Sequence, residues 1–113
     1  MLVVNRFTVT DADTSGFVDR ARSALRALAG CPGYQRGAVH RALEEPETWC
    51  LVTEWESVGT YRRALGAFEV KVHATPLLAA SRDEPSAFEA LVTALPGEEP
   101  ATHTSDRATG PGR

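Results

Sequence analysis

The stretch YQRGAVHRALEEPETWCLVTEW, residues 34–55, sets the fold of this chain. Residues 48–55 are rich in aromatic, β-branched and aliphatic side chains, a composition that favours a strand. Residues 34–42 precede them as a second expected strand. The segment between them, residues 43–47, carries three glutamates and Pro46, which is typical of a loop that reverses the chain. Residues 34–55 therefore predict an antiparallel hairpin.

The segments before this hairpin predict a strand and then a helix. Residues 2–9, LVVNRFTV, have the composition of a strand. Apolar residues then recur at helical spacing from Phe17 to Leu28. Gly30 and the Cys-Pro-Gly turn at 31–33 end this helix.

The segments after the hairpin predict further helices and a fourth strand. Ser57 is placed to cap a short helix whose apolar stripe runs from Tyr61 to Phe68, and a second helical piece continues to about Ser81. Residues 86–94 fit a strand or a helix by periodicity alone. The order β-α-β-β-α-β favours a strand, because a ferredoxin-like antiparallel sheet has its fourth strand there. The predicted fold class is therefore α+β, ferredoxin-like.

The composition changes abruptly near residue 95. From residue 96 to 113 the only apolar residues besides Gly and Pro are Ala101 and Ala108. Such a segment buries too little surface to offset the entropy of ordering it. We expect one domain over residues 1–95 and a flexible C-terminal tail over residues 96–113.

The predicted sheet has helices on one face only. Its third strand is nevertheless apolar on both faces, with Trp49, Leu51 and Trp55 on one face and Cys50 and Val52 on the other. A strand with one solvated face alternates more cleanly between apolar and polar residues. We therefore expect a second copy of the chain to cover the open face, which makes the protein a homodimer.

Charge and composition exclude several classes of partner. The 113 residues include 15 acidic and 12 basic side chains, a net charge of −3, which offers no basic surface for nucleic acid or an anionic membrane. No segment approaches the roughly 18 apolar residues of a membrane span, and the N-terminus does not resemble a secretory signal, so we expect a cytoplasmic protein. No phosphate-binding or dinucleotide-binding motif occurs. His40 has no second ligand nearby in sequence, so we expect no metal site.

Two aromatic residues near a strand-to-helix corner are candidates for a binding pocket. Trp55 ends the third strand and Tyr61 lies on the following helix, where they could form the floor of a pocket for a flat polycyclic substrate or fill the core. If the hairpin is symmetric about its loop, Arg36 lies opposite Trp55 and forms a cation–π pair with it.

Three polar residues carry open alternatives. The carboxamide of Asn5 lies in an apolar strand and needs hydrogen-bond partners, so it could donate to a substrate oxygen or bind a nearby loop. His73 is a packed or surface histidine, or else a ligand or base. Thr75 could form a hydrogen bond within the same pocket or cap the segment that begins at Pro76.

Several local strings resemble the antibiotic-biosynthesis monooxygenases, which are small dimeric α+β-barrel proteins with a ferredoxin-like protomer. These strings spread over about residues 3–92. They are Val4-Asn5-Arg6-Phe7-Thr8-Val9, Pro32-Gly33-Tyr34, Val52-Thr53-Glu54-Trp55-Glu56-Ser57, Tyr61 and His73-Ala74-Thr75.

The resemblance implies an activity. One group of these enzymes oxidises anthrone-type or phenolic aromatic polyketides to quinones with molecular oxygen and no cofactor. The substrate loses a proton, and its electron-rich anion reduces oxygen directly, so the protein binds the rings, stabilises the anion and excludes water. We therefore expect a monooxygenase, an oxidoreductase of polyketide antibiotic biosynthesis, with O2 as co-substrate and a small aromatic substrate.

The resemblance also implies functional residues. The strand-1 Asn, the strand-3 Trp and the following Tyr line the pocket in that group, and these positions are Asn5, Trp55 and Tyr61 here. We expect Asn5, Trp55 and His73 as catalytic residues. The expected substrate-binding residues are Tyr61, Arg36, Leu51, Thr75 and Leu78.

Two positions depart from that pattern. Leu51 stands where a second Asn is common, and Leu78 stands near an expected Arg. Without that amide and that cation, an oxyanion is less well stabilised unless Arg36, Arg63 or His73 substitutes for them.

Two alternative functions follow from the same fold. One is a ligand-binding or cyclase-like module without oxygenase activity, which the apolar Leu51 and Leu78 favour. The other is a haem-degrading monooxygenase, for which Asn5 and His73 fit and Ala64 replaces the expected Trp. Haem and flavin are the alternative cofactors.

Overall fold

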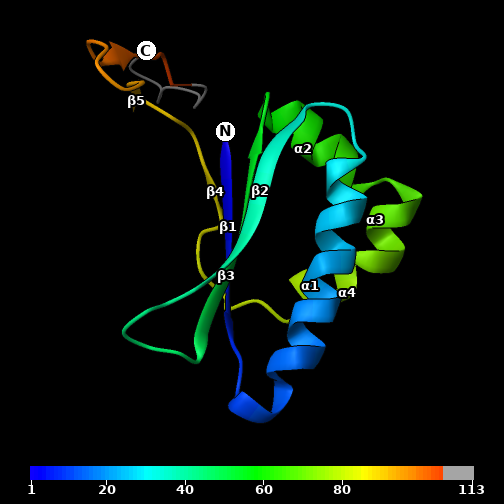
Figure 1. Ribbon diagram of the computed structural model, residues 1–113. Helices are drawn as coiled ribbons and strands as arrows, with labels where there is room; N and C mark the ends of the chain where they lie inside the picture. Colours follow the sequence, from blue (N-terminus) through cyan, green and yellow to red (C-terminus); the bar gives the residue numbers. More distant parts are fainter. Residues whose placement is uncertain (106–113) are drawn as a thin grey trace.

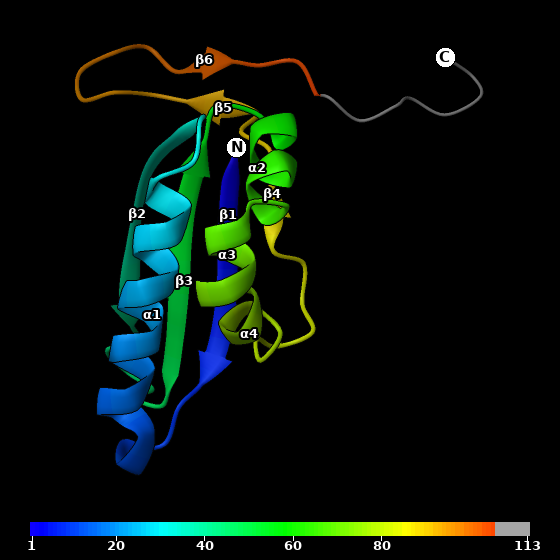
Figure 2. The same cartoon turned by 90° about the vertical axis from the view of Figure 1, so that its right-hand side faces the viewer.

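The computed structural model describes residues 1–105 of the chain. An antiparallel sheet of four strands is covered by helices on one face (Figures 1 and 2). The strands are β1 (Leu2–Thr8), β2 (Tyr34–Arg41), β3 (Thr48–Trp55) and β4 (Ala87–Phe88), in the order β2-β3-β1-β4. This is the ferredoxin-like order, and it confirms the predicted α+β fold class.

The helical layer consists of one long helix and several short ones. A single 3-10 turn, η1 (Asp11–Asp13), precedes α1 (Thr14–Ala29). The three short helices α2 (Val58–Leu65), α3 (Phe68–His73) and α4 (Thr75–Leu78) lie beside α1 over the sheet (Figure 2). The helix boundaries agree with the apolar spacing of the sequence.

The Gly33 turn packs directly against the start of α2. Ser57 caps this helix as predicted, because its hydroxyl accepts a hydrogen bond from the Thr60 N–H at 3.1 Å. Gly33 has a φ of +87°, and a Cβ placed on it would lie 2.3 Å from the Cβ of Thr60. The Gly33 carbonyl also accepts a hydrogen bond of 2.8 Å from the N–H of Glu56. Only glycine allows the chain to approach the α2 cap so closely.

The predicted register of the hairpin is wrong by one residue. Arg36 lies opposite Glu54 and His40 opposite Cys50, and the pairing is already shifted next to the loop, where Arg41 lies opposite Trp49. Trp55 lies opposite Tyr34, beyond an irregularity between Tyr34 and Arg36. A one-residue shift moves a side chain to the other face of the sheet. The predicted cation–π pair between Arg36 and Trp55 therefore does not form.

The predicted strand over residues 86–94 is divided between two sheets. Ala87 and Phe88 pair with β1, whereas β5 (Val92–Thr93) pairs with β6 (Ala101–Thr102) in a separate two-stranded sheet. Figure 1 shows that this second sheet projects from the body of the protein. The chain leaves the edge of the main sheet after Phe88, so residues 91–95 have no apolar face to pack against.

The predicted domain boundary at residue 95 falls between β5 and β6. Residues 96–105 of the predicted tail are thus described, and they include β6. Residues 106–113 lie outside the described part of the chain. The division into domain and tail stays a prediction.

The core lies between the sheet and the helices. Helix α1 contributes its apolar stripe, as its spacing predicts, and the helix-facing side of β3 is buried along its whole length. The buried apolar residues are Val3, Phe7, Val9, Phe17, Ala21, Ala24, Leu28, Trp49, Leu51, Trp55, Ala64, Val70, Ala74 and Leu77. The other side of the sheet has no helix over it.

Candidate functional site

Pairing of the three long strands arranges their helix-facing side chains in rows. Asn5 of β1 lies opposite Leu51 of β3, and Phe7 lies opposite Trp49. At the other end of β3, Trp55 is buried beneath α2. The structure thus places Asn5, Leu51 and Trp55 on the same, helix-facing side of the sheet, with Trp55 four residues along β3 from the Asn5–Leu51 pair.

Trp55 is fully buried, with 0% of its surface exposed. Its ring packs against Tyr34 and Tyr61 at centroid distances of 5.4 and 5.5 Å. Its indole N–H donates a hydrogen bond of 2.8 Å to the hydroxyl of Thr53. Trp55 is therefore a packed core residue whose one polar group is already satisfied.

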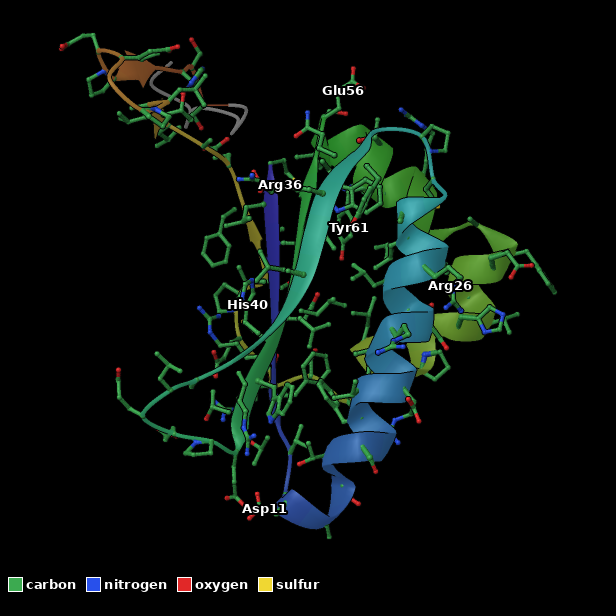
Figure 3. The ribbon with its side chains drawn as sticks, viewed as in Figure 1. Asp11, Arg26, Arg36, His40, Glu56 and Tyr61 are labelled. Atoms are coloured by element: carbon green, nitrogen blue, oxygen red, sulfur yellow. The ribbon has the colours of Figure 1, made fainter. Side chains whose placement is uncertain are left out.

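Tyr61 lies partly buried at the edge of this aromatic cluster. It projects from α2 on the helix side of the sheet (Figure 3). Burial raises the pKa of the Tyr61 phenol above its ordinary value, because a phenolate would lose its hydration there. Tyr61 therefore stays protonated at neutral pH and can donate a hydrogen bond to a ligand oxygen.

Asn5 is half-buried in the middle of the helix-facing side of the sheet. Within residues 1–105 its carboxamide makes no hydrogen bond to another residue. Its two N–H donors and its carbonyl acceptor are therefore available to a ligand.

Three further predicted residues provide no charged group. Leu51 is 1% exposed and packs in the core, and Leu78 packs against the core from α4. Thr75 is exposed, and its hydroxyl donates a hydrogen bond of 3.4 Å to the carbonyl of Val70. These positions support an apolar interior and add no oxyanion donor to it.

His73 lies on the outer side of α3, away from Asn5 and Trp55. Its Nε2 is 3.3 Å from a carboxylate oxygen of Glu69, one helical turn earlier. The inner side of α3 is formed by Val70 and Ala74, which are both fully buried. The structure therefore does not bring His73 into the interior with the other predicted residues.

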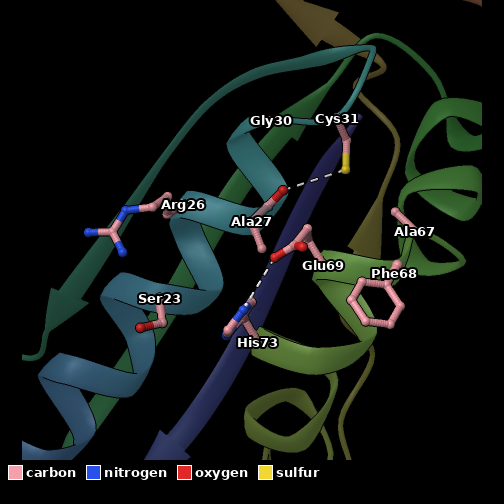
Figure 4. A pocket seen from close by; sticks show the side chains of 9 residues that line it. All are labelled: Ser23, Arg26, Ala27, Gly30, Cys31, Ala67, Phe68, Glu69 and His73. Carbon is pink, nitrogen blue, oxygen red and sulfur yellow. Dashed lines mark hydrogen bonds and ion pairs between the residues drawn. The ribbon is translucent and has the colours of Figure 1, made fainter.

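A cleft of about 470 Å³ between α1 and α3 contains His73 (Figure 4). Arg26 lines it from α1 and Phe68 from α3, and the thiol of Cys31 closes its upper end. Phe68 is 76% exposed, so the cleft is an open groove at the protein surface. His73 also lines a second open hollow of about 320 Å³ with Arg20 and Pro76, so a ligand would meet His73 at the surface of the helical layer.

Arg36 lies on the face of the sheet opposite to Trp55. It forms an ion pair with Glu54, and Figure 3 shows it with His40 on the side away from the helices. Because the sheet separates them, Arg36 cannot contact a ligand that is bound between β3 and α2.

The described residues contain neither a metal cluster nor a bilayer-spanning helix. No three His, Cys, Asp or Glu side chains within residues 1–105 gather in a way that could hold a metal ion. Each helix there is too short or too polar to cross a lipid bilayer. For haem, Ala64 at the expected Trp position is a buried residue of α2, and His73 is paired with Glu69. These residues do not form a haem pocket.

Trp49 is a further candidate site residue, because of its indole N–H, and it is not among the residues predicted from the sequence. Its ring is 8% exposed, and its indole nitrogen is buried without a hydrogen-bond partner in the described part of the chain. The sequence places Trp49 on the same face as Trp55, but hydrogen-bond partners depend on the tertiary structure. From the sequence, the one available signal is its place on the same strand face as Leu51 and Trp55.

Taken together, these residues define an α+β protein with an apolar, aromatic interior and a few uncharged hydrogen-bond donors. The sequence matches the family model "Antibiotic biosynthesis monooxygenase" over residues 1–74. The chain belongs to this family, as the local strings of the sequence predict. It matches no curated protein.

Two solved structures illustrate the likeness. A variant of SnoaB, a cofactor-independent oxygenase from Streptomyces nogalater, is 25% identical with a TM-score of 0.62, and the match covers 96% of this chain and 95% of that one. A conserved protein from Methanosarcina mazei Go1 is 22% identical with a TM-score of 0.62, covering 76% of this chain and 84% of that one. The second likeness concerns the fold alone.

Proposed function

We propose that this protein is a cofactor-independent monooxygenase that oxidises an anthrone or phenol of polyketide type to a quinone. The similarity to SnoaB over nearly the whole of both chains supports this activity. The observation that carries the proposal is the unpartnered Asn5 carboxamide, half-buried in an otherwise apolar layer. Such a donor fits an oxygen of a flat aromatic substrate.

For anthrone the reaction balances without an added reductant. The substrate loses a proton from its methylene carbon, and the resulting enolate transfers electrons to O2. A carbon–oxygen bond forms at that carbon, and loss of water leaves a second carbonyl. One anthrone and one O2 thus give one anthraquinone and one water, and all the electrons come from the substrate.

The chain's own groups would act on the anion formed in this reaction. Asn5 would donate a hydrogen bond to the enolate oxygen, and the protonated Tyr61 hydroxyl would provide a second donor. The apolar side chains around Leu51 and Trp55 would hold the rings and exclude water. Because Leu51 and Trp55 are fully buried, the helical layer must move away from the sheet before a tricyclic ligand can enter.

His73 retains a proposed role as proton acceptor at the α1–α3 groove. Its imidazole is oriented by Glu69 and is accessible from that groove. Because His73 lies outside the interior that contains Asn5, it could accept a proton only from a substrate bound in this groove; in that case the His73→Ala variant loses oxygen uptake and an added imidazole buffer restores part of it. Unchanged uptake in His73→Ala would remove this role and leave Asn5 as the reacting contact.

Oxygen uptake with anthrone tests the proposed activity. Chelator-treated protein should consume O2 faster than buffer alone and form anthraquinone in equal amount. The Asn5→Ala variant should be slower by about a hundredfold, the effect of removing one oxyanion donor. Arg22→Ala, a matched control on the exposed side of α1, should retain the full rate. Uptake that is equal in Asn5→Ala and the wild type would contradict the proposed role of Asn5.

Leu51 and Leu78 favour a second candidate function. They make the interior more apolar than an oxyanion site requires, which fits a ligand-binding or cyclase-like protein of the same pathway. Tight binding of anthrone without oxygen uptake would support that alternative.

We further propose that the protein acts as a homodimer in the cytoplasm. The sheet side opposite the helices is uncovered and carries Val4 and Val52. Leu91, Val92 and Leu95 are 46%, 62% and 66% exposed in the projecting segment. A second copy would cover this apolar surface. Light scattering should give twice the mass of the chain, and Val52→Glu should reduce it to the monomer mass.

A further inference from the structure

The two tryptophans of the chain differ in the hydrogen bonding of their indole N–H groups. Both lie on the helix-facing side of β3. The N–H of Trp55 is bonded to Thr53, whereas the nitrogen of Trp49 is the one buried side-chain polar atom within residues 1–105 that has no partner. An indole N–H can only donate, so it requires an acceptor. A buried donor without one destabilises the fold by as much as a lost hydrogen bond.

The surroundings of Trp49 are aromatic and include one arginine, Arg41, which is paired with a carboxylate. Phe7 lies opposite it in β1, and Phe17 of α1 packs edge-on at a centroid distance of 5.4 Å. The guanidinium carbon of Arg41 lies 5.2 Å from the centre of its ring. Arg41 also donates from Nε to the carbonyl of Pro46 at 2.8 Å, so its side chain is held in place. Its guanidinium also lies 3.7 Å from a carboxylate oxygen of Asp11, so this charge is paired, and the attraction for a ligand oxygen rests on the Trp49 N–H itself.

A small cleft borders the same aromatic residues. It has a volume of about 180 Å³, and Phe7 and Phe17 line it together with Leu77 of α4. Trp49 itself does not line this cleft, and Asp13 and Arg20 are among its other lining residues. The cleft opens beside Phe7 and Phe17, the two rings that lie next to Trp49.

Asn5 is the nearest unpartnered amide on the same face. Because Asn5 lies opposite Leu51 and Phe7 lies opposite Trp49, Asn5 and Trp49 are diagonal neighbours on adjacent antiparallel strands. Such neighbours lie about 7–8 Å apart. One flat ligand could therefore accept hydrogen bonds from both residues. The pair flanks Leu51, the position at which the chain lacks an amide.

We propose that the Trp49 indole N–H is a substrate-binding donor for the carbonyl or enolate oxygen of a flat aromatic ketone. The class of ligand rests on the proposed function. Trp49 lies two residues before Leu51 on β3 and faces the same side of the sheet. Its indole N–H supplies the hydrogen-bond donor that the leucine side chain lacks. Trp55 holds the aromatic cluster together and does not bind the ligand oxygen.

Nuclear magnetic resonance of the labelled indole groups tests this assignment. The chain has two tryptophans, so the spectrum has two indole N–H signals, which Trp49→Phe and Trp55→Phe assign. Anthrone is titrated under nitrogen, where no turnover occurs. The matched probe is 9,10-dihydroanthracene, which has the same three-ring skeleton and no oxygen. Saturating anthrone should move the Trp49 proton downfield and leave the Trp55 proton in place, and dihydroanthracene should not produce the downfield shift.

A binding comparison separates hydrogen bonding from packing. Trp49→Phe keeps an aromatic ring and removes a donor that has no partner in the free protein, so the fold should be retained. This variant should bind anthrone about tenfold more weakly, which corresponds to one hydrogen bond, and should bind dihydroanthracene within about twofold of the wild type. Equal losses for both ligands would mean that Trp49 contributes only packing.

The outcomes separate this assignment from the proposed activity. An unmoved Trp49 signal at saturating anthrone, or no anthrone binding at all, would overturn the assignment. Oxygen uptake together with an unmoved signal would leave the activity standing and remove Trp49 from it. A shifted signal without oxygen uptake would support the donor role and contradict the oxygenase activity.

Discussion

Replacement of Gly33 by alanine should destabilise the protein by about 3 kcal/mol. At a φ of +87° an alanine is strained by roughly 1–2 kcal/mol. Its Cβ would lie 2.3 Å from the Cβ and 2.5 Å from the Cγ2 of Thr60, and overpacking of this kind costs about 1–3 kcal/mol. The Cβ of Thr60 remains in every residue except glycine, so shortening Thr60 to alanine should not relieve the clash.

Urea unfolding measures this loss. The free energy of unfolding is compared at one protein concentration, because the apparent stability of an oligomer depends on it. Gly30→Ala is the matched control in the same turn region, since Gly30 has a φ of −81° and a Cβ there meets nothing closer than 3.6 Å. This control should lie within about 0.5 kcal/mol of the wild type or be slightly stabilising. A Gly33→Ala variant within about 1 kcal/mol of Gly30→Ala would refute the described packing of the turn on α2.

Three further predictions concern the aromatic cluster and the open face. Thr53→Val should cost about 1–3 kcal/mol in the same unfolding assay, because it leaves the buried Trp55 N–H without an acceptor; no loss would contradict that hydrogen bond. The raised pKa of Tyr61 means that the unfolded phenol ionises first as the pH rises above about 10. Stability should therefore fall from that pH upward, and a melting series should show a smaller fall in Tyr61→Phe; equal slopes in the two proteins would count against burial of the phenol. Arg36→Ala should change the unfolding free energy by less than about 1 kcal/mol, because the ion pair with Glu54 is on an exposed surface; a larger loss would show that the pair is not solvated.

The strands and the long helix could be predicted from the sequence because their apolar patterns are strong. The period-2 alternation of β3 and the helical stripe of α1 each bury one continuous side. The register of the hairpin could not be predicted, since it is set by the geometry of the loop over residues 42–47, whose composition shows only that the chain reverses there. The β-α-β-β-α-β order indicated a strand at 86–94 but could not show that its two ends pair with different strands.

The candidate site was predictable in part. Asn5 and Trp55 could be assigned to the helix-facing side because strand alternation determines the face on which a side chain lies. The outward position of His73 depends on which side of the short α3 faces the core, and six residues are too few to define that from spacing. The contrast between the satisfied Trp55 and the unsatisfied Trp49 depends on Thr53 being placed beside one indole and nothing polar beside the other.

The central claim is that this chain oxidises an aromatic ketone with O2 and no cofactor. The most direct measurement is oxygen uptake with anthrone in air, compared between the chelator-treated wild type and Asn5→Ala. In a parallel reaction under ¹⁸O2, mass spectrometry of the anthraquinone counts the labelled oxygen atoms. We predict uptake well above buffer, one labelled oxygen in each anthraquinone, and a rate about a hundredfold lower in Asn5→Ala. Wild-type uptake that does not exceed the rate in buffer, at an anthrone concentration that saturates binding, would contradict the claim.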